Sequence, residues 1–424
     1  MNYFINALSY SSLFIMVYFS VFLMVTLIEN RRRIRQEENL PHGADTNNLN
    51  SLDFPSVTIL VPVFNEQNTV DKTVQSLLSL NYPKDKLKIM VVDDGSKDNT
   101  WQVVQKYQGH DQVLLHQKEN GGKYTALNYG IENSTTEFIG CLDADSFVDS
   151  NALLYIVPHF ANKNVAAVTP SLKIQNPDSI LGMVQNAEYN MGIFTRKILG
   201  FLDAQYVTPG PFSIFRKEIF SKVGKYKHAH NTEDLEMALR LQDHHYKIVN
   251  AHKAVVYTVA PRTLYRLYKQ RVRWTGGFIQ NAIDYRKMIL NPKYGNLGML
   301  VLPISMYLIL ISLALLFYTL FNFFKNISNT YNKMRVTNWN LGFDNIKAFT
   351  LDWWLYNIQI PVLVGLIVGV LIIFAIWYGK RLTGIKDKKM IDVIYFLLLY
   401  SLISPLWLIT SVYNTIRNKD ASWR

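Results

Sequence analysis

The stretch Ile139-Gly140-Cys141-Leu142-Asp143-Ala144-Asp145 joins an apolar run to two carboxylates that stand two positions apart. The apolar part predicts a buried β-strand over Glu137–Leu142, because short apolar runs bounded by polar residues are typical of strands in parallel sheets. Two carboxylates at the end of a buried strand are costly unless a cation neutralises them. The stretch therefore predicts an α/β fold with a site for a hard divalent cation at one edge of its sheet.

Strands and helices alternate from this stretch back to residue 57. The predicted strands and helices are, in chain order, Val57–Val63, Thr69–Leu80, Leu87–Val92, Asn99–Lys106, Val113–Leu115 and Lys123–Ile131. Such alternation implies a mostly parallel sheet with right-handed crossovers. Ligands of these sheets bind beyond the carboxyl ends of the strands. The polar residues at those ends are Asn65, Glu66, Asp93 and Asp143, and they are candidate ligand-binding residues.

Both ends of the chain contain long apolar runs. The first covers residues 4–28, and its length of about 25 residues is enough to cross a bilayer. Its lack of a basic start and of a small-x-small cleavage site favours a retained span over a signal peptide. Three more runs follow at about 297–324, 353–378 and 391–413, although Ser404-Pro405 interrupts the last of them. The sequence thus predicts a multi-pass membrane protein.

The basic residues are placed beside these apolar runs. The formal charge is +12, and the cluster Arg31–Arg35 directly follows the first run. Basic residues that flank apolar runs are typical of the cytoplasmic ends of membrane spans, so no nucleic-acid partner is expected. We predict an external N-terminus and a cytoplasmic segment over residues 40–295. A single cysteine, Cys141, excludes disulfides and a cysteine-built metal site within one chain.

Two further loops carry polar groups that suit a nucleotide ligand. Asp93-Asp94-Gly95-Ser96 follows the second strand, where Asp94 or Ser96 can alternatively serve as a helix cap. Asn120-Gly121-Gly122-Lys123 precedes a helix, so backbone N–H groups and a lysine can lie near a phosphate. The spacing is not that of a P-loop, and no Gly-x-Gly-x-x-Gly follows the first strand, which excludes the usual NAD-binding pattern.

The second half of the predicted domain contains two charged groups on helices. Thr232-Glu233-Asp234 begins a helix, and its ordinary interpretation is an N-cap followed by two acids that favour the helix dipole. Gln270-Arg271-Val272-Arg273-Trp274 lies in an amphipathic helix from Leu264 to about Tyr285. Arg271 and Arg273 cannot share one face of that helix. Taken alone, this helix is an interfacial membrane anchor.

Taken together, the order of these motifs is similar to that of the inverting glycosyltransferases of family 2. More narrowly, it resembles the membrane-embedded polysaccharide synthases, which make cellulose, hyaluronan, poly-N-acetylglucosamine or chitin oligosaccharides. The resemblance extends from about Val57 to about Tyr294, and Gln-Arg-Val-Arg-Trp is its most specific element. The stretch Tyr206–Arg216 resembles the Gly-Pro stretch of hyaluronan and chitin synthases, with Pro209 as a departure from it.

This resemblance implies a role for each candidate residue. Asp234 matches the general base that takes a proton from the acceptor hydroxyl. Asp145, with Asp143 in the donor or metal shell, would bind Mg²⁺ or Mn²⁺. The residues expected to bind the donor are Asn65, Glu66, Asp93, Lys123, Asp143, Gln270, Arg271 and Arg273. Those expected on the acceptor side are Trp274, Glu233 and Gly210.

The resemblance also implies an architecture, namely a nucleotide-diphospho-sugar transferase domain of the GT-A type flanked by transmembrane helices. We expect an N-terminal transmembrane helix (1–30) and a basic juxtamembrane segment with a linker (31–53). The cytoplasmic glycosyltransferase domain (54–260) and interfacial amphipathic helices with the Gln-Arg-Val-Arg-Trp group (261–295) follow. The C-terminal transmembrane region (296–424) would contain about three spans.

The implied activity is transfer of a hexose or N-acetylhexosamine from a nucleotide-diphosphate sugar, expected to be a UDP-sugar, with inversion. The expected acceptor is a growing β-linked glycan, and membrane lipids and accessory secretion proteins are compatible partners. Single transfer to a lipid, such as a polyprenyl phosphate or glycolipid, is the alternative enzyme. A membrane scaffold or channel with a degenerate nucleotide-binding domain is the alternative without activity, and the intact Asp145 and Asp234 argue against it.

Overall fold

The structure is a computed structural model that describes residues 2–38, 54–336, 360–385, 390–417 and 419. The chain divides into two compact units. One contains Met1–Phe22 and Ile304–Leu371, and the other contains Leu23–Pro303 and Ile372–Arg424. The second unit holds the whole β-sheet, so the candidate site lies within it.

The sheet has eight strands in the order β3-β2-β1-β4-β7-β6-β8-β5. Its first half is parallel, and β1 pairs with both β2 and β4. In its second half β7 runs antiparallel to β4 and to β6. The strands are β1 (Val57–Val63), β2 (Leu87–Asp93), β3 (Val113–Gln117), β4 (Phe138–Cys141), β5 (Ser146–Val148), β6 (Val165–Ile174), β7 (Ser213–Arg216) and β8 (Lys247–Thr258).

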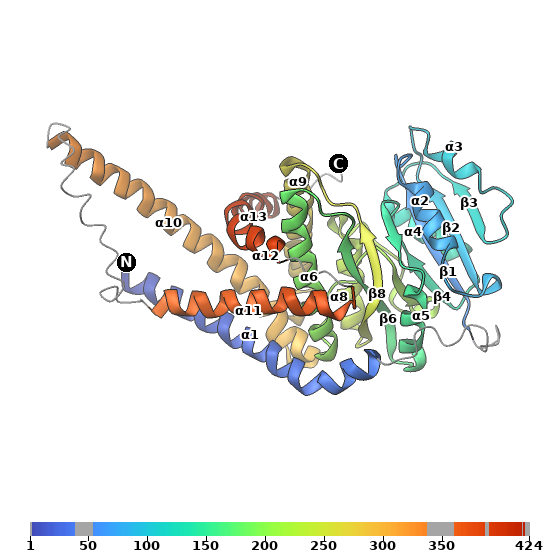
Figure 1. The fold of residues 1–424 in the computed structure, drawn as a ribbon, viewed down its shortest axis with the longest axis horizontal. Helices are drawn as coiled ribbons and strands as arrows, with labels where there is room; N and C mark the ends of the chain where they lie inside the picture. The colour runs from blue at the N-terminus through green and yellow to red at the C-terminus, as the bar shows by residue number, and fades with distance from the viewer. Residues whose placement is uncertain (1, 39–53, 337–359, 386–389, 418, 420–424) are drawn as a thin grey trace. The chain divides into compact units, whose positions relative to one another are not determined.

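Helices cover both faces of this sheet, because the central strands are apolar on both sides. Along β1, Ile59 and Val61 enter one apolar core, while Leu60 enters the other. The first core is completed by α2 (Val70–Leu78), α3 (Thr100–Gln105) and α5 (Ala152–Ile156). The second is completed by α4 (Lys123–Asn133), α7 (Lys217–Val223) and α8 (Glu233–Asp243). The result is a helix–sheet–helix arrangement, in which Figure 1 shows the parallel strands with α2 and α4 beside them.

The strands and helices predicted before residue 142 are confirmed, with ends that differ by at most two residues. Two longer helices follow in the same unit, α6 (Ile180–Phe201) and α9 (Leu264–Asp284). The second of these confirms the helix predicted around Gln270–Trp274. Both helices matter for the candidate site, because an ion pair between the partly exposed Glu188 and the buried Arg271 joins them.

Four helical segments are long and apolar enough to cross a membrane: Tyr10–Glu37, Leu297–Val336, Gly365–Leu382 and Ile391–Ile416. They correspond to the four predicted runs, although part of the run at 353–378 lies outside the described residues. The helices that contribute to them are α1 (Asn2–Glu38), α10 (Leu302–Val336), α11 (Ile360–Leu382), α12 (Ile391–Tyr395) and α13 (Ser401–Ile416).

Two details differ from the sequence-based expectation. The helix α1 continues through the arginine cluster to Glu38, so Glu37 is not part of a linker, and residues 39–53 lie outside the described residues. The Glu37 carboxylate instead pairs with the buried Lys197. Pro405 does not interrupt the last apolar run, because it lies inside α13. A long apolar helix tolerates the loss of the one backbone hydrogen bond that proline removes.

Candidate active site

The ends of β1 and β2 are joined by hydrogen bonds between their loops. The Asn65 side chain accepts a bond from the backbone N–H of Lys97 (2.8 Å), and the backbone N–H of Asn65 donates to the Ser96 hydroxyl (3.0 Å). The Glu66 N–H donates to the hydroxyl of Thr100 at 2.7 Å. The two predicted donor residues of β1 therefore lie beside the loop after β2, at the sheet edge where a ligand is expected.

The two aspartates after β2 hold that loop in place. Asp93 is fully buried and accepts bonds from the Ser96 N–H (3.1 Å) and from Gln117 (2.9 Å). Its predicted contact with a nucleoside stays a prediction. Asp94 accepts bonds from the backbone N–H groups of Gly121 (3.0 Å) and Gly122 (2.8 Å). The alternative interpretation as helix caps is therefore wrong for Asp94, since its carboxylate fixes the glycine loop instead.

Lys123 and Asp143 form an ion pair at the carboxyl edge of the sheet. The lysine begins α4, directly after the glycine loop, while the aspartate follows β4. Burial lowers the pKa of Lys123, but the Asp143 carboxylate together with Cys141 and Glu233 raises it more, so that it lies above its usual range and the side chain is charged. Gly210 packs against this pair, because a Cβ at residue 210 would lie 2.9 Å from the Lys123 Nζ and 3.1 Å from an Asp143 oxygen.

Asp145 lies close to other carboxylates. Burial, followed by the nearby charges of Asp143 and Glu66, raises the pKa of Asp145 to about 7. Carboxylates that raise one another's pKa in this way are stabilised by a bound divalent cation. Among the described residues, no cluster of three or more His, Cys, Asp or Glu groups could hold a metal ion. The assignment of Asp143 and Asp145 as metal ligands stays a prediction, and a metal held by them would take its remaining ligands from phosphate oxygens and water.

The predicted base is held at the start of α8. The backbone carbonyl of Asp234 accepts bonds from the Thr208 N–H (3.1 Å) and hydroxyl (2.7 Å), which ties α8 to the predicted acceptor stretch. Burial raises the pKa of Asp234, and Asp143 adds to this rise, while Lys123 and Arg273 oppose it. The pKa of Glu233 is also raised, mainly by burial. Thr232 occupies the N-cap position without a side-chain cap, whereas both acids lie in the first turn, where the helix dipole favours them, and Asp234 accepts a bond from the Leu235 N–H at 3.0 Å.

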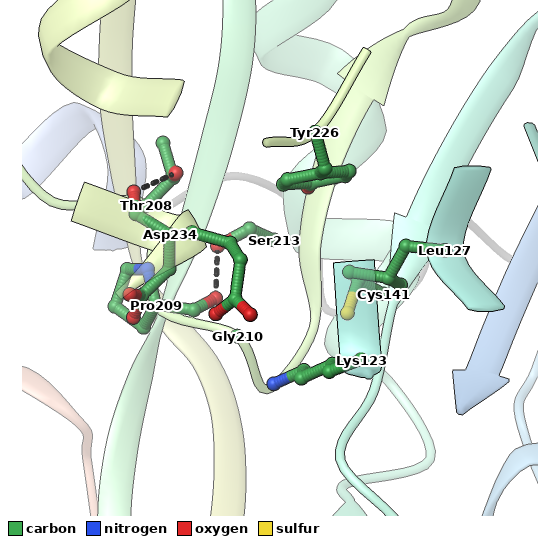
Figure 2. Close-up of a pocket in the computed structure, with 10 residues that line it drawn as sticks. Lys123, Leu127, Cys141, Thr208, Pro209, Gly210, Ser213, Tyr226 and Asp234 are labelled. Atoms are coloured by element: carbon green, nitrogen blue, oxygen red, sulfur yellow. Dashed lines mark hydrogen bonds between the residues drawn. The ribbon is translucent and has the colours of Figure 1, made fainter. Parts of the chain in front are cut away.

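One small cavity brings several of the predicted residues together. Figure 2 shows Lys123 and Asp234 on two sides of it, with Gly210 between them. The cavity is lined by Lys123, Leu127, Cys141, Thr208, Pro209, Gly210, Ser213, Tyr226, Glu233 and Asp234. A lysine that can neutralise phosphate and a carboxylate that can accept a proton thus face one space. Such a pairing is what a displacement at a sugar carbon requires.

The two arginines of α9 have different surroundings, as their spacing predicts. Arg271 is 3% exposed and donates to Glu188 at 2.6 Å, while its guanidinium lies 4.3 Å from the centre of the Trp274 ring. The charge of Arg273 instead acts on Glu233 and Asp234, where it partly offsets the rise in their pKa that burial causes. Arg273 therefore lies nearer to the carboxylates of the cavity, whereas Arg271 is engaged by Glu188.

Gln270 and Trp274, the other two predicted site residues of the Gln-Arg-Val-Arg-Trp group, also lie on α9. Trp274 is 37% exposed, so its ring keeps surface available for a ligand. The side-chain oxygen of Gln270 is buried and has no hydrogen-bond partner among the described residues. The predicted roles of Trp274 as acceptor platform and of Gln270 as a donor ligand stay predictions.

A close contact joins α8 to α9 immediately before the base. A Cβ at Gly277 would lie 2.3 Å from the Thr232 hydroxyl, so only glycine allows the two helices to approach this closely. Asn281 donates to the same hydroxyl at 2.9 Å and to the Gly277 carbonyl at 2.8 Å. The helix α9, which carries Arg273 and Trp274, is therefore fixed against Thr232 at the start of α8.

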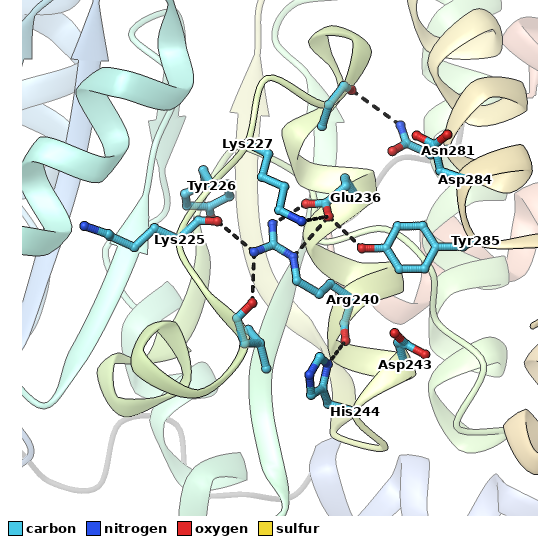
Figure 3. A network of polar contacts seen from close by, with 12 residues as sticks. Lys225, Tyr226, Lys227, Glu236, Arg240, Asp243, His244, Asn281, Asp284 and Tyr285 are labelled. Carbon is cyan, nitrogen blue, oxygen red and sulfur yellow. Dashed lines mark hydrogen bonds and ion pairs between the residues drawn. The ribbon is translucent and has the colours of Figure 1, made fainter. Parts of the chain in front are cut away.

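A second set of polar contacts supports α8 one turn further along (Figure 3). Glu236 forms a buried ion pair with Arg240 and accepts a bond from the Tyr285 hydroxyl at 2.7 Å. Arg240 also donates to the carbonyls of Val223 (3.1 Å) and Lys225 (2.8 Å). These bonds tie the base-bearing helix both to the end of α9 and to the loop that carries the cavity residue Tyr226.

Several residues of the site carried no sufficient signal in the sequence. The sequence offers Asp94 either as part of the doublet after the second strand or as a helix cap, and nothing in it indicates the pairing of Asp94 with Lys118 at 2.6 Å. Thr208 and Glu188 act through contacts to residues far along the chain, which a local pattern does not reveal. The doublet Asp93-Asp94 was the one signal that could have identified Asp94.

Comparison with known proteins agrees with this geometry. The sequence profile described as glycosyl transferase family 2 matches residues 58–224. A poly-beta-1,6-N-acetyl-D-glucosamine synthase of Staphylococcus epidermidis is 34% identical over 224 residues, which cover 52% of this chain and 54% of that protein. The synthase of that name from Staphylococcus aureus strain MSSA476 is 33% identical over 232 residues, covering 54% and 56%. The chain thus spans about half the length of the curated relatives that it matches.

A solved structure shares the fold. The mannosyltransferase PcManGT from Pyrobaculum calidifontis, solved in complex with GDP-Man and Mn²⁺, has a TM-score of 0.56 and 17% identity, and the match covers 96% of this chain and 99% of that one. At this identity the likeness concerns the fold alone. The predicted α/β fold of the GT-A type, joined to apolar helices, is therefore confirmed. Within the chain, residues 58–224 are similar to a glycosyl transferase family 2 domain.

Proposed function

We propose that the chain is a membrane-bound glycosyltransferase that moves a hexose or N-acetylhexosamine from a nucleotide-diphosphate sugar to an acceptor hydroxyl, with inversion. The cavity that Lys123 and Asp234 share is the observation that carries this proposal. In an inverting displacement one carboxylate takes the acceptor proton while the nucleotide diphosphate leaves, so no carboxylate nucleophile is needed. Asp234 suits the first task, since burial raises its pKa above the usual range and makes it a better proton acceptor.

The donor would bind at the carboxyl ends of the parallel strands. Asn65, Glu66 and Asp93 would face the nucleoside, and Lys123 and Arg273 would approach the diphosphate. Asp143 and Asp145 would hold Mg²⁺ or Mn²⁺, which supplies charge neutralisation of the departing diphosphate when bound. UDP is the expected nucleotide, by analogy with the synthases that the chain resembles.

A growing β-linked glycan is the proposed acceptor. Relatives named poly-beta-1,6-N-acetyl-D-glucosamine synthases match the chain at 33–34% identity, which favours a processive polymerase of N-acetylhexosamine. Trp274, which is 37% exposed on α9, and Gly210, which lines the cavity, would contact this acceptor, as the resemblance implies. Single transfer to a lipid is the second enzyme compatible with this site.

The proposed orientation places the catalytic domain in the cytoplasm, at the plasma or inner membrane. Four helical segments are long and apolar enough to span the bilayer, and the cluster Arg31–Arg35 ends the first. Basic residues at the end of a span favour the cytoplasmic side. Nucleotide-sugars would then reach the site from the cytoplasm, while membrane lipids and any accessory secretion proteins surround the helical region.

The proposal predicts turnover of one nucleotide-sugar from a panel and a polymeric product. Purified protein in detergent or nanodiscs should release nucleotide diphosphate from UDP-N-acetylhexosamine when Mn²⁺ is present, and sizing of the product should show chains of increasing length. The variant Asp234→Asn, in the same preparation, is the control for background hydrolysis. A single sugar found only in the lipid extract would favour the alternative enzyme. No turnover of any nucleotide-sugar would contradict the proposal.

A further inference from the structure

Glu188 on α6 binds side chains from two other helical segments, one with each of its carboxylate oxygens. Its Oε2 accepts a bond from Nη2 of Arg271 on α9 at 2.6 Å, and its Oε1 accepts a bond from the Tyr400 hydroxyl at 3.1 Å. Tyr400 ends the π-helical segment Phe396–Tyr400 that joins α12 to α13. Both oxygens of the carboxylate are thus engaged, in bonds that its charge strengthens.

The guanidinium of Arg271 depends on this carboxylate. Arg271 is 3% exposed, and within the described part of the chain its Nε and Nη1 atoms have no hydrogen-bond partner. An arginine without a partner would direct its charged end toward water, because a buried charge is costly unless it is paired. The ion pair with Glu188 therefore determines where the guanidinium lies.

The same guanidinium lies over the ring of Trp274, 4.3 Å from the centre of the ring. Arg271 and Trp274 stand three positions apart on α9, so they are neighbours on its surface. A cation at this distance is attracted to the face of an indole. It also covers that face, which leaves the opposite face and the edge of the ring for a ligand. Glu188 thus acts on the ring through Arg271.

Tyr400 is fixed by its neighbours in the last apolar segment. Its ring lies 4.7 Å from that of Phe396 and 5.7 Å from that of the buried Trp407. A π-helical turn inside a longer helix frequently marks a functional site. The packed ring directs the Tyr400 hydroxyl toward Glu188, so the position of the carboxylate depends on this segment.

Contacts that do not involve Glu188 hold the backbone of α9. The Ser411 hydroxyl on α13 donates to the carbonyl of Val272 at 3.2 Å, and the Tyr268 hydroxyl donates to Thr410 at 2.8 Å. The close approach to α8 at Gly277 fixes the next part of the helix. Removal of the Glu188 carboxylate should therefore release the guanidinium and the indole without displacing α9.

We propose that Glu188 is a positioning residue for the acceptor, because it holds Arg271 against one face of Trp274 and so orients the indole on which a sugar ring stacks. This inference rests on the proposed function, which makes Trp274 part of the acceptor site. It assigns Arg271 to the support of this ring and leaves Arg273 for the donor diphosphate. Tyr400 holds Glu188 in turn and joins the acceptor site to the last apolar segment.

The test compares acceptor and donor kinetics in the full-length protein. With short β-linked N-acetylglucosamine oligosaccharides as acceptors, Glu188→Gln should raise the apparent KM for the acceptor about tenfold, the size expected for loss of a hydrogen bond between charged groups. The KM for the nucleotide-sugar should stay unchanged, since Trp274 is proposed to bind the acceptor. Tyr400→Phe removes one of the two bonds to Glu188 and should raise the acceptor KM about threefold.

Two matched substitutions and a double variant separate positioning from a general effect on the protein. Glu218→Gln changes an exposed glutamate on α7, and Tyr413→Phe changes an exposed tyrosine on α13, so both should leave the two KM values unchanged. If Glu188 acts through Arg271, the acceptor KM of Glu188→Gln/Arg271→Gln should equal that of Arg271→Gln. Independent roles would multiply the two effects and would overturn the inference.

Circular dichroism and gel filtration show whether each variant is folded. In a folded Glu188→Gln protein, an unchanged acceptor KM would overturn this inference alone. A loss of affinity for UDP with Mn²⁺ in that folded protein would also overturn it, because Arg271 would then serve the donor. If Glu188→Gln does not fold, Tyr400→Phe decides, and an unchanged acceptor KM there overturns the inference. Failure of the parent protein to elongate any oligosaccharide or to turn over any nucleotide-sugar would instead overturn the proposed function, and the inference with it.

Discussion

Replacing Asp234 with Asn should lower the rate of sugar transfer by about 10²–10⁴-fold, the usual contribution of a general base. Asparagine keeps the shape of the side chain but cannot accept the proton of the acceptor hydroxyl. The backbone carbonyl that binds Thr208 is unaffected, so α8 should stay in place. Nucleotide-sugar binding should hardly change, because the base acts on the acceptor. Single-turnover transfer and calorimetric donor affinity together measure both effects.

The pH profile gives an independent check of this role. Burial raises the pKa of Asp234, so the rate of the parent enzyme should fall as the pH drops through that raised pKa and the base becomes protonated. Asp234→Asn should lose this acidic limb. Glu233→Gln is the matched control, since Glu233 is the adjacent buried acid, and it should keep the limb. Transfer at near-parental rate in Asp234→Asn would mean that Glu233 or another group is the base.

Replacing Asp145 with Asn should abolish most metal-dependent turnover and lower kcat by about 10³-fold, because a cation that neutralises the leaving diphosphate contributes several kcal/mol. The fold should survive, since the substitution removes a carboxylate that burial and the neighbours Asp143 and Glu66 disfavour. Calorimetry of UDP with and without Mn²⁺ is the deciding measurement. The metal should enhance UDP binding in the parent and have little effect in the variant.

A surface carboxylate provides the control for this substitution. Asp203 is exposed and pairs with Lys247 at 2.7 Å, outside the cavity, so Asp203→Asn should leave the metal effect intact. An equal enhancement of UDP binding by Mn²⁺ in Asp145→Asn and in the parent would show that the metal is held elsewhere.

Much of the first half of the domain follows from its sequence. The strand Val57–Val63 was predicted to the residue, because a continuous apolar run bounded by polar residues has few alternatives. The helix around Gln270–Trp274 was likewise evident from its amphipathic pattern. These elements are specified locally, and the carboxyl ends of parallel strands necessarily meet at one edge. The meeting of Asn65 with the loop after β2 follows from that rule.

The parts that could not be predicted depend on contacts between distant residues. The strand β7 inserts antiparallel between β4 and β6, and no local pattern distinguishes this from a parallel neighbour. The engagement of Arg271 by Glu188 depends on the packing of two helices, so the sequence could separate the two arginines but not assign their partners. The sequence suggests that Pro405 interrupts the last apolar run, because proline strongly destabilises a helix in a soluble protein. In the structure Pro405 lies inside α13, since a long apolar helix accommodates it.

The stereochemistry of the product tests the central claim most directly, because a single base in the cavity requires inversion at the sugar carbon. The parent enzyme should be incubated with an α-linked nucleotide-sugar, Mn²⁺ and an oligosaccharide acceptor, and the new linkage followed by proton NMR from the first turnovers. The account predicts a β-linkage, with the large coupling constant of a diaxial proton pair for a gluco-configured sugar. An α-linkage would contradict it, since retention needs a nucleophile or a different mechanism at the site assigned to Asp234.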